Sequence, residues 1–114
     1  MTYINSGKHG EYKERKILNG NLVELLSRSK ELEAVYIKVE PGKALGKAHK
    51  HKCEEFKYVL EGTLEFQIGD IKKIVGAGGW LHHECSSLHS ISNKTSKKAA
   101  YLTISVPPGC MAVK

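Results

Sequence analysis

The chain has 114 residues, which fits one domain large enough to bury a core without disulfide or metal staples. Its 18 Lys and Arg against 12 Asp and Glu give a charge of +6, but the positive residues are spread along the whole chain without an RNA-binding signature. We therefore expect a solvated lysine-rich surface and no nucleic acid partner, and, since no stretch approaches roughly 18 uninterrupted apolar residues, no membrane role.

The first apolar stretch, residues 22–35, has two readings. Four leucines between positions 22 and 32 partly satisfy helical spacing, and Asn19-Gly20-Asn21 ahead of them would make a fair helix cap. The alternative is a pair of strands, at residues 22–26 and 32–39, that turns at residues 27–30. The local pattern leaves both open, and the resemblance described below favours the strands.

From Val35 onward, short apolar runs are cut by glycine, proline or aspartate at intervals of about ten residues, which is typical of an all-β chain. Gly69-Asp70 is a plausible two-residue hairpin turn, because glycine tolerates a positive φ. The expected strands are residues 35–39, 56–60, 64–68, 71–75, 80–83, 89–92 and 99–106.

Two imidazoles and a carboxylate lie close together in the sequence. His49 and His51 are two residues apart, so on an extended segment they point to one face, and Glu55 follows them. A third imidazole, His89, can join from a distant segment. Three neutral nitrogens and one anionic oxygen suit Fe, Mn, Ni, Co or Zn and leave positions open for a ligand. The alternative is a set of inert histidines exposed between lysines.

The spacing of these residues resembles the first motif of the cupin superfamily, G(X)5HXH(X)3,4E(X)6G. His49, His51, Glu55 and Gly62 fall on the motif, whereas Gly42 stands one residue too far from His49. That departure concerns only the length of a loop.

The second cupin motif, G(X)5PXG(X)2H(X)3N, can be placed on Gly78, His89 and Asn93. Its proline is replaced by Glu84 and its second glycine by Ser86. Residues 54–62 and 103–108 also look like the small-molecule-sensing cupin domain of many helix-turn-helix regulators.

The resemblance implies an all-β fold, the antiparallel double-stranded jelly-roll β-barrel, over a single domain of residues 1–114 with its core at about 22–108. It further implies a homodimer, with a divalent metal ion (Fe, Mn, Ni, Co or Zn) and a small-molecule ligand inside the barrel mouth. By the family pattern, the metal ligands are His49, His51, Glu55 and His89.

Two further residues are candidates for binding the substrate or ligand. Lys57 shares strand parity with Glu55, and a lysine beside the site could hold an anion; the alternative is a lysine whose stem lies on the barrel wall while its amine reaches water. His82 and His83 are adjacent, so they point to opposite faces of a strand. His83 is the better candidate, because an even number of residues separates it from His89.

The three cysteines, Cys53, Cys85 and Cys110, are an odd number without the spacing of a disulfide framework, and no apolar leader precedes the polar first residues. We therefore expect a cytoplasmic protein with reduced thiols. Cys53 could add a thiolate to the site, although a tight connection between strands would turn it outward.

Two classes of function stay open. As a binding module, the barrel uses its metal to hold a small, oxygen-rich, anionic ligand, which Lys47, Lys50 and Lys52 would help to attract. As an enzyme, a dioxygenase, isomerase or lyase, the same metal acts on a small-molecule substrate as a Lewis acid or redox centre. The same four ligands serve both, so the sequence does not separate them.

Overall fold

The computed structural model describes residues 4–8, 14–49, 52–85 and 89–108, with the main chain alone for residues 46–49. Within these ranges every regular element is a β-strand, which excludes the helix alternative for residues 22–35. In chain order the strands are β1 (Glu14–Leu18), β2 (Asn21–Arg28), β3 (Glu33–Val39), β4 (Ala44–His49), β5 (Glu54–Glu61), β6 (Thr63–Ile68), β7 (Ile71–Gly76), β8 (Trp80–Glu84), β9 (His89–Ser92) and β10 (Ala99–Val106). No helix in the described part of the chain has the length and hydrophobicity needed to cross a membrane.

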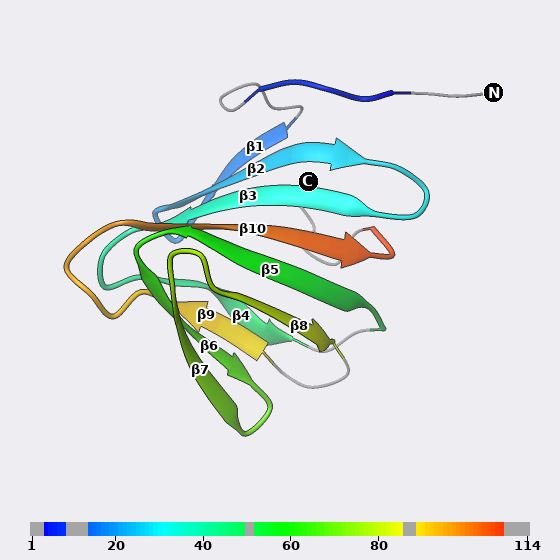
Figure 1. Ribbon diagram of the computed structural model, residues 1–114. Helices are drawn as coiled ribbons and strands as arrows, with labels where there is room; N and C mark the ends of the chain where they lie inside the picture. The colour runs from blue at the N-terminus through cyan, green and yellow to red at the C-terminus, as the bar shows by residue number, and fades with distance from the viewer. Residues whose placement is uncertain (1–3, 9–13, 50–51, 86–88, 109–114) are drawn as a thin grey trace.

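The strands form two antiparallel sheets. The larger sheet has six strands in the order β1-β2-β3-β10-β5-β8, and the smaller has four in the order β4-β9-β6-β7. Figure 1 shows the two sheets as separate layers, with β5 and β8 running above β9 and β6. The expected all-β jelly-roll architecture is confirmed, although the edges of the two sheets are not joined into a closed barrel.

Each strand predicted after Val35 is present, whereas β1 and β4 are not predicted by the sequence pattern. The sequence signal for β1 is Asn19-Gly20, which is not a helix cap but the turn of the β1–β2 hairpin. Both residues have positive φ, 50° and 82°, and Leu18 pairs directly with Asn21. Asn-Gly is the strongest short hairpin signal because both turn positions need positive φ.

The hairpin between β2 and β3 turns two residues later than expected. Its turn covers residues 29–32, where Ser29 N–H donates to the carbonyl of Leu32 at 2.9 Å. Arg28 and Glu33 are paired across the strand ends, and the Arg28 guanidinium lies 2.6 Å from the Glu33 carboxylate. The register of this hairpin has one irregularity, between Leu25 and Ser27.

The core lies between the sheets and takes one side of each strand. The rings of Phe66 on β6 and Tyr101 on β10 pack edge to face, with centroids 5.7 Å apart, which joins the two layers. The remaining core residues are Val23, Leu25, Val35, Ile37, Val39, Leu45, Val59, Leu64, Ile91 and Ala99.

Two glycines explain how the chain leaves β5 and β6. Gly62 has φ +72°, and a Cβ there would lie 2.6 Å from the carbonyl oxygen of Lys98, so only glycine fits. Gly69 has φ 58° and closes the predicted hairpin, in which Ile68 pairs with Ile71. Because Gly62 lies this close to Lys98, the turn after β5 packs against the start of β10 and holds β5 beside that strand.

Candidate functional site

The face of the larger sheet that points into the molecule carries a buried ion pair on β5. Strand alternation turns Glu55 and Lys57 inward, and they are 1% and 0% exposed. Nζ of Lys57 lies 2.5 Å from Oε1 of Glu55. The other carboxylate oxygen accepts a hydrogen bond from the hydroxyl of Ser105 on β10 at 3.0 Å. The carboxylate is therefore held on both oxygens.

The environment of Glu55 favours its ionised form. Burial by itself would raise the pKa of this carboxyl group. The charge and hydrogen bond of Lys57, the hydrogen bond from Ser105 and the nearby His89 act in the opposite direction, and the pKa ends below its ordinary value. Glu55 is thus an anion at neutral pH, as a metal ligand must be.

His83 enters the same interior from β8, where it pairs directly with Glu55. Its Nδ1 lies 3.0 Å from the carbonyl oxygen of Glu84, which can only accept, so Nδ1 carries the proton. Its Nε2 then accepts from Nζ of Lys57 at 2.8 Å. Burial, together with the Lys57 ammonium, lowers the pKa of His83, which agrees with a neutral ring.

His89, on β9 of the other sheet, is the last of the described side chains that surround the Glu55 carboxylate. It is 2% exposed, and its Nε2 lies 3.7 Å from Oε1 of Glu55. Its ring centroid is 5.3 Å from that of His83. Oε1 of Glu55 is therefore the point at which an ammonium and two imidazoles from three other strand positions converge.

Glu55 and His89 offer donor atoms of the types that bind a metal, and the distance between those atoms is close to that between two ligands of one ion. Two ligand atoms bound tetrahedrally at about 2.0–2.1 Å lie about 3.4 Å apart, close to the 3.7 Å between Glu55 and His89. The main chain of His49 in β4 pairs directly with His89. The His49 side chain and the whole of His51 lie outside the described residues, so the four-ligand set stays a prediction.

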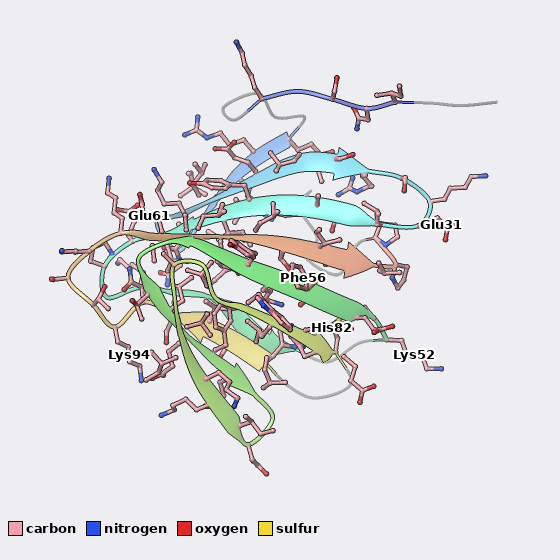
Figure 2. All side chains as sticks on the ribbon, in the orientation of Figure 1. Glu31, Lys52, Phe56, Glu61, His82 and Lys94 are labelled. Carbon is pink, nitrogen blue, oxygen red and sulfur yellow. A yellow bond between two sulfur atoms is a disulfide. The ribbon has the colours of Figure 1, made fainter. Side chains whose placement is uncertain are left out.

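Lys57 and His83, the two residues predicted to bind the ligand, lie on the face where strand parity placed them. Lys57 points inward, but its amine does not reach water; it is fully buried against Glu55 and His83. His82 faces the opposite side from His83 and pairs with exposed Glu54 at 2.9 Å. Figure 2 labels His82 beside Phe56, on the neighbouring strand. The expectation that only one of the two adjacent histidines enters the interior is confirmed.

Asn93, the last residue of the second motif, has a structural role. Its side-chain amide donates to the carbonyls of Val39 and Lys97, and its oxygen accepts from the backbone and hydroxyl of Thr95. These bonds fix the connection between β9 and β10.

Two buried hydroxyl groups on β10 were not predicted as site residues. Tyr101 and Thr103 face inward, and Thr103 pairs directly with Lys57. Neither hydroxyl has a hydrogen-bond partner among the described residues. Burial and the charge of Glu55 raise the pKa of Tyr101 well above its ordinary value. In the sequence, this lining is indicated by polar residues at alternate positions of the strand 99–106.

The expectation of reduced thiols is wrong for two of the three cysteines. Cys53, directly before β5, and Cys85, directly after β8, form a disulfide with their Cα atoms 5.2 Å apart. Cys53 does not turn outward, because it shares strand parity with Glu55. The 32-residue separation hides this pairing in the sequence; only the β5–β8 register brings the cysteines together. Cys110 lies outside the described residues.

The comparisons with known proteins agree with this architecture. The family model described as "Cupin domain" matches residues 35–105. No curated protein matches the chain. Among solved structures, an RmlC-like cupin from Shewanella frigidimarina superposes with a TM-score of 0.78 at 21% identity, covering 93% of this chain and 92% of that chain.

Two other structural neighbours are proteins of different kinds. The Cupin_2 domain of an XRE family transcriptional regulator from Enterobacter cloacae has a TM-score of 0.67 at 17% identity, covering 75% of this chain and 94% of that one. A cupin-superfamily sugar phosphate isomerase from Silicibacter pomeroyi has a TM-score of 0.68 at 20% identity, covering 79% and 61%. At these identities the likeness concerns the fold alone.

Proposed function

The chain belongs to the cupin family, and from that premise we propose that it binds a divalent metal ion through His49, His51, Glu55 and His89. The ion is Fe, Mn, Ni, Co or Zn, all of which accept mixed imidazole and carboxylate ligands. Buried, ionised Glu55 beside His89 supports this assignment.

We further propose that the ligand is a small, oxygen-rich anion bound in the barrel interior. The observation that carries this proposal is the polar lining beside the ion pair, where the buried hydroxyls of Tyr101 and Thr103 have no partner among the described residues. A buried polar group without a hydrogen bond costs about 1–3 kcal/mol, so a ligand with several oxygens would be stabilised there. Lys57, whose ammonium pairs with Glu55, lies opposite Thr103 on the same wall.

The surroundings of the site also favour an anion. A single carboxylate neutralises only part of a divalent charge, so the metal centre stays cationic. Lys52, which Figure 2 labels next to the start of β5, is exposed. The side chain of Lys47 and the whole of Lys50 lie outside the described residues.

An enzymatic role, as a dioxygenase, isomerase or lyase, is the second candidate. The same fold occurs in a sugar phosphate isomerase and in the cupin domain of a transcriptional regulator, so it is compatible with either role. When bound, the metal would supply Lewis acidity or redox chemistry to either role.

The deciding experiment is metal analysis of the purified protein, followed by thermal-shift titration with small acids, sugars and aromatic compounds. We expect a divalent ion and stabilisation by an oxygen-rich anion that disappears when a chelator strips the metal. Tight binding of an apolar ligand, unchanged by stripping, would contradict the proposal. Oxygen consumption or conversion of the bound compound would establish the enzyme.

We propose, finally, a homodimer formed by the outer face of β5 and β8. Phe56 and Trp80 stack there with ring centroids 5.9 Å apart, and Trp80 is 62% exposed. Tyr58 pairs with Trp80, and exposed Leu60 extends the face along β5. A continuous apolar patch of this kind is typical of a protein–protein contact, and a second copy of the chain would cover it.

A further inference from the structure

The two disulfide-bonded cysteines are held together by the main chain as well as by their own bond. The N–H of Cys85 donates to the carbonyl of Cys53 at 2.9 Å. The ladder continues from there through the pairs Glu54–Glu84 and Glu55–His83. Because these hydrogen bonds fix both backbone positions, the two sulfurs stay adjacent when the bond between them is reduced.

A carboxylate lies beside the sulfurs. Cys53 and Glu55 are two residues apart on one strand, so their side chains share the inner face. One ligand atom from each of Cys53, Glu55 and Cys85 lies within 4.8 Å of the other two. Cys85 is buried and Cys53 is half-buried, so Cys53 is the more accessible of the two residues.

We propose that the reduced Cys53–Cys85 pair and Glu55 form a second metal site, selective for a thiophilic ion such as Zn²⁺ or Cd²⁺. Two thiolates and a carboxylate are a softer donor set than imidazoles and a carboxylate, and they suit these ions. The disulfide is the closed state of this site, because each sulfur is then bonded to the other and neither is a thiolate. The site does not rest on the proposed function, although both metal centres use Glu55.

Opening the site requires a reductant, and a small thiol provides one. Its thiolate attacks Sγ of the more exposed Cys53, the bond between the cysteines breaks, and Cys85 leaves as a thiolate. A second thiol attacks the resulting mixed disulfide at the small-molecule sulfur, which releases Cys53 as a thiolate and a small-molecule disulfide. Two thiols are oxidised for each protein disulfide reduced. Protons taken up by the cysteines are released when the metal binds.

The test is a cadmium titration of the wild-type protein before and after reduction with a phosphine that is then removed without air. We expect the reduced protein to show a sulfur-to-cadmium charge-transfer band that saturates at about one ion per chain, and the oxidised protein to show none. A reduced protein without the band, or one whose circular dichroism no longer shows β-sheet, would overturn the proposal. The wild-type comparison needs no substitution, so a folding defect in a variant cannot imitate its result.

Four variants locate the site. Cys85→Ser should abolish the band, whereas the matched control Cys110→Ser should keep it; the reverse pattern would overturn the assignment. Glu55→Gln should weaken cadmium binding by at least about tenfold, the loss expected on removing a metal partner. His89→Ala removes a ligand of the metal site proposed above but leaves Cys53, Cys85 and Glu55 in place. It should therefore keep the band, which separates failure of this inference from failure of the proposed function.

Discussion

Nζ of Lys57 lies 2.5 Å from Oε1 of Glu55, and neither side chain is exposed to water. Each charge is therefore compensated by the other and not by solvent. The ammonium also donates to His83 Nε2, so it lies beside the Glu55 oxygen toward which His83 and His89 are directed. Without a metal ion, Lys57 is the internal cation of the site.

Removing that cation should destabilise the metal-free protein. Lys57→Met leaves a buried carboxylate without its counter-charge, which should lower the free energy of unfolding by about 3–5 kcal/mol. Adding Glu55→Gln in the same chain should restore much of the loss, because neither charge then remains. Urea denaturation measures both. Exposed Lys52→Met is the control and should stay within about 0.5 kcal/mol of wild type.

The same substitution tests how the ligand is recognised. If the Lys57 ammonium attracts an anion, Lys57→Met should weaken binding of an anionic ligand by about tenfold or more and spare a neutral analogue of the same shape. Calorimetric titration of metal-loaded protein gives both affinities. Equal losses for the two compounds would point to damaged packing instead.

Loss of a metal ligand should lower the metal content sharply. His51→Ala and His89→Ala should each reduce affinity by more than about tenfold, since even the loss of a partner that only orients a ligand costs 10–100-fold. His82→Ala is the matched control, because His82 lies on the outer face against Glu54. Elemental analysis after dialysis gives the stoichiometry. Full occupancy in a His49→Ala, His51→Ala double variant would refute the four-ligand assignment.

Stability should fall in mild acid because of His83. Burial and the Lys57 ammonium lower the pKa of His83 below its ordinary 6.5. Between those two pKa values the unfolded chain binds more protons than the folded one, so stability decreases as the pH falls below about 6.5, by at most about 1.4 kcal/mol per pH unit.

The contribution of His83 can be isolated by substitution. His83→Gln should flatten the pH dependence of the unfolding free energy between about pH 5 and pH 7, where an ordinary histidine titrates. His82→Gln is the matched control on the outer face of the same strand, where His82 pairs with exposed Glu54. An unaltered slope in His83→Gln would show that another group is responsible.

The proposed dimer is tested on the outer face of β5 and β8. Trp80→Glu places a charge in the stack with Phe56 and should shift the protein from dimer to monomer in sedimentation at micromolar concentration. Ile74→Glu is the matched control, since Ile74 is equally apolar and exposed but lies on β7 of the other sheet. A wild-type protein that sediments as a monomer, or equal effects of both changes, would contradict this interface.

The sequence by itself determined the strands and the faces of their residues. Short apolar runs ended by turn residues located β5 to β10, since these signals are local. Strand parity placed Glu55 and Lys57 on one face and Phe56 and Tyr58 on the other, as the burial of β5 confirms. The motif spacing indicated the family and the residues to examine for metal.

Only the tertiary structure decided which of these residues meet. Thr103 faces Lys57, and Cys85 faces Cys53, because β10 and β8 flank β5 in a particular register. Register depends on the packing of the whole sheet and not on neighbouring residues, so a spacing of 32 residues gives no sign of the disulfide. Full burial of the Lys57 amine likewise depends on a partner from another strand, His83, which no local pattern specifies.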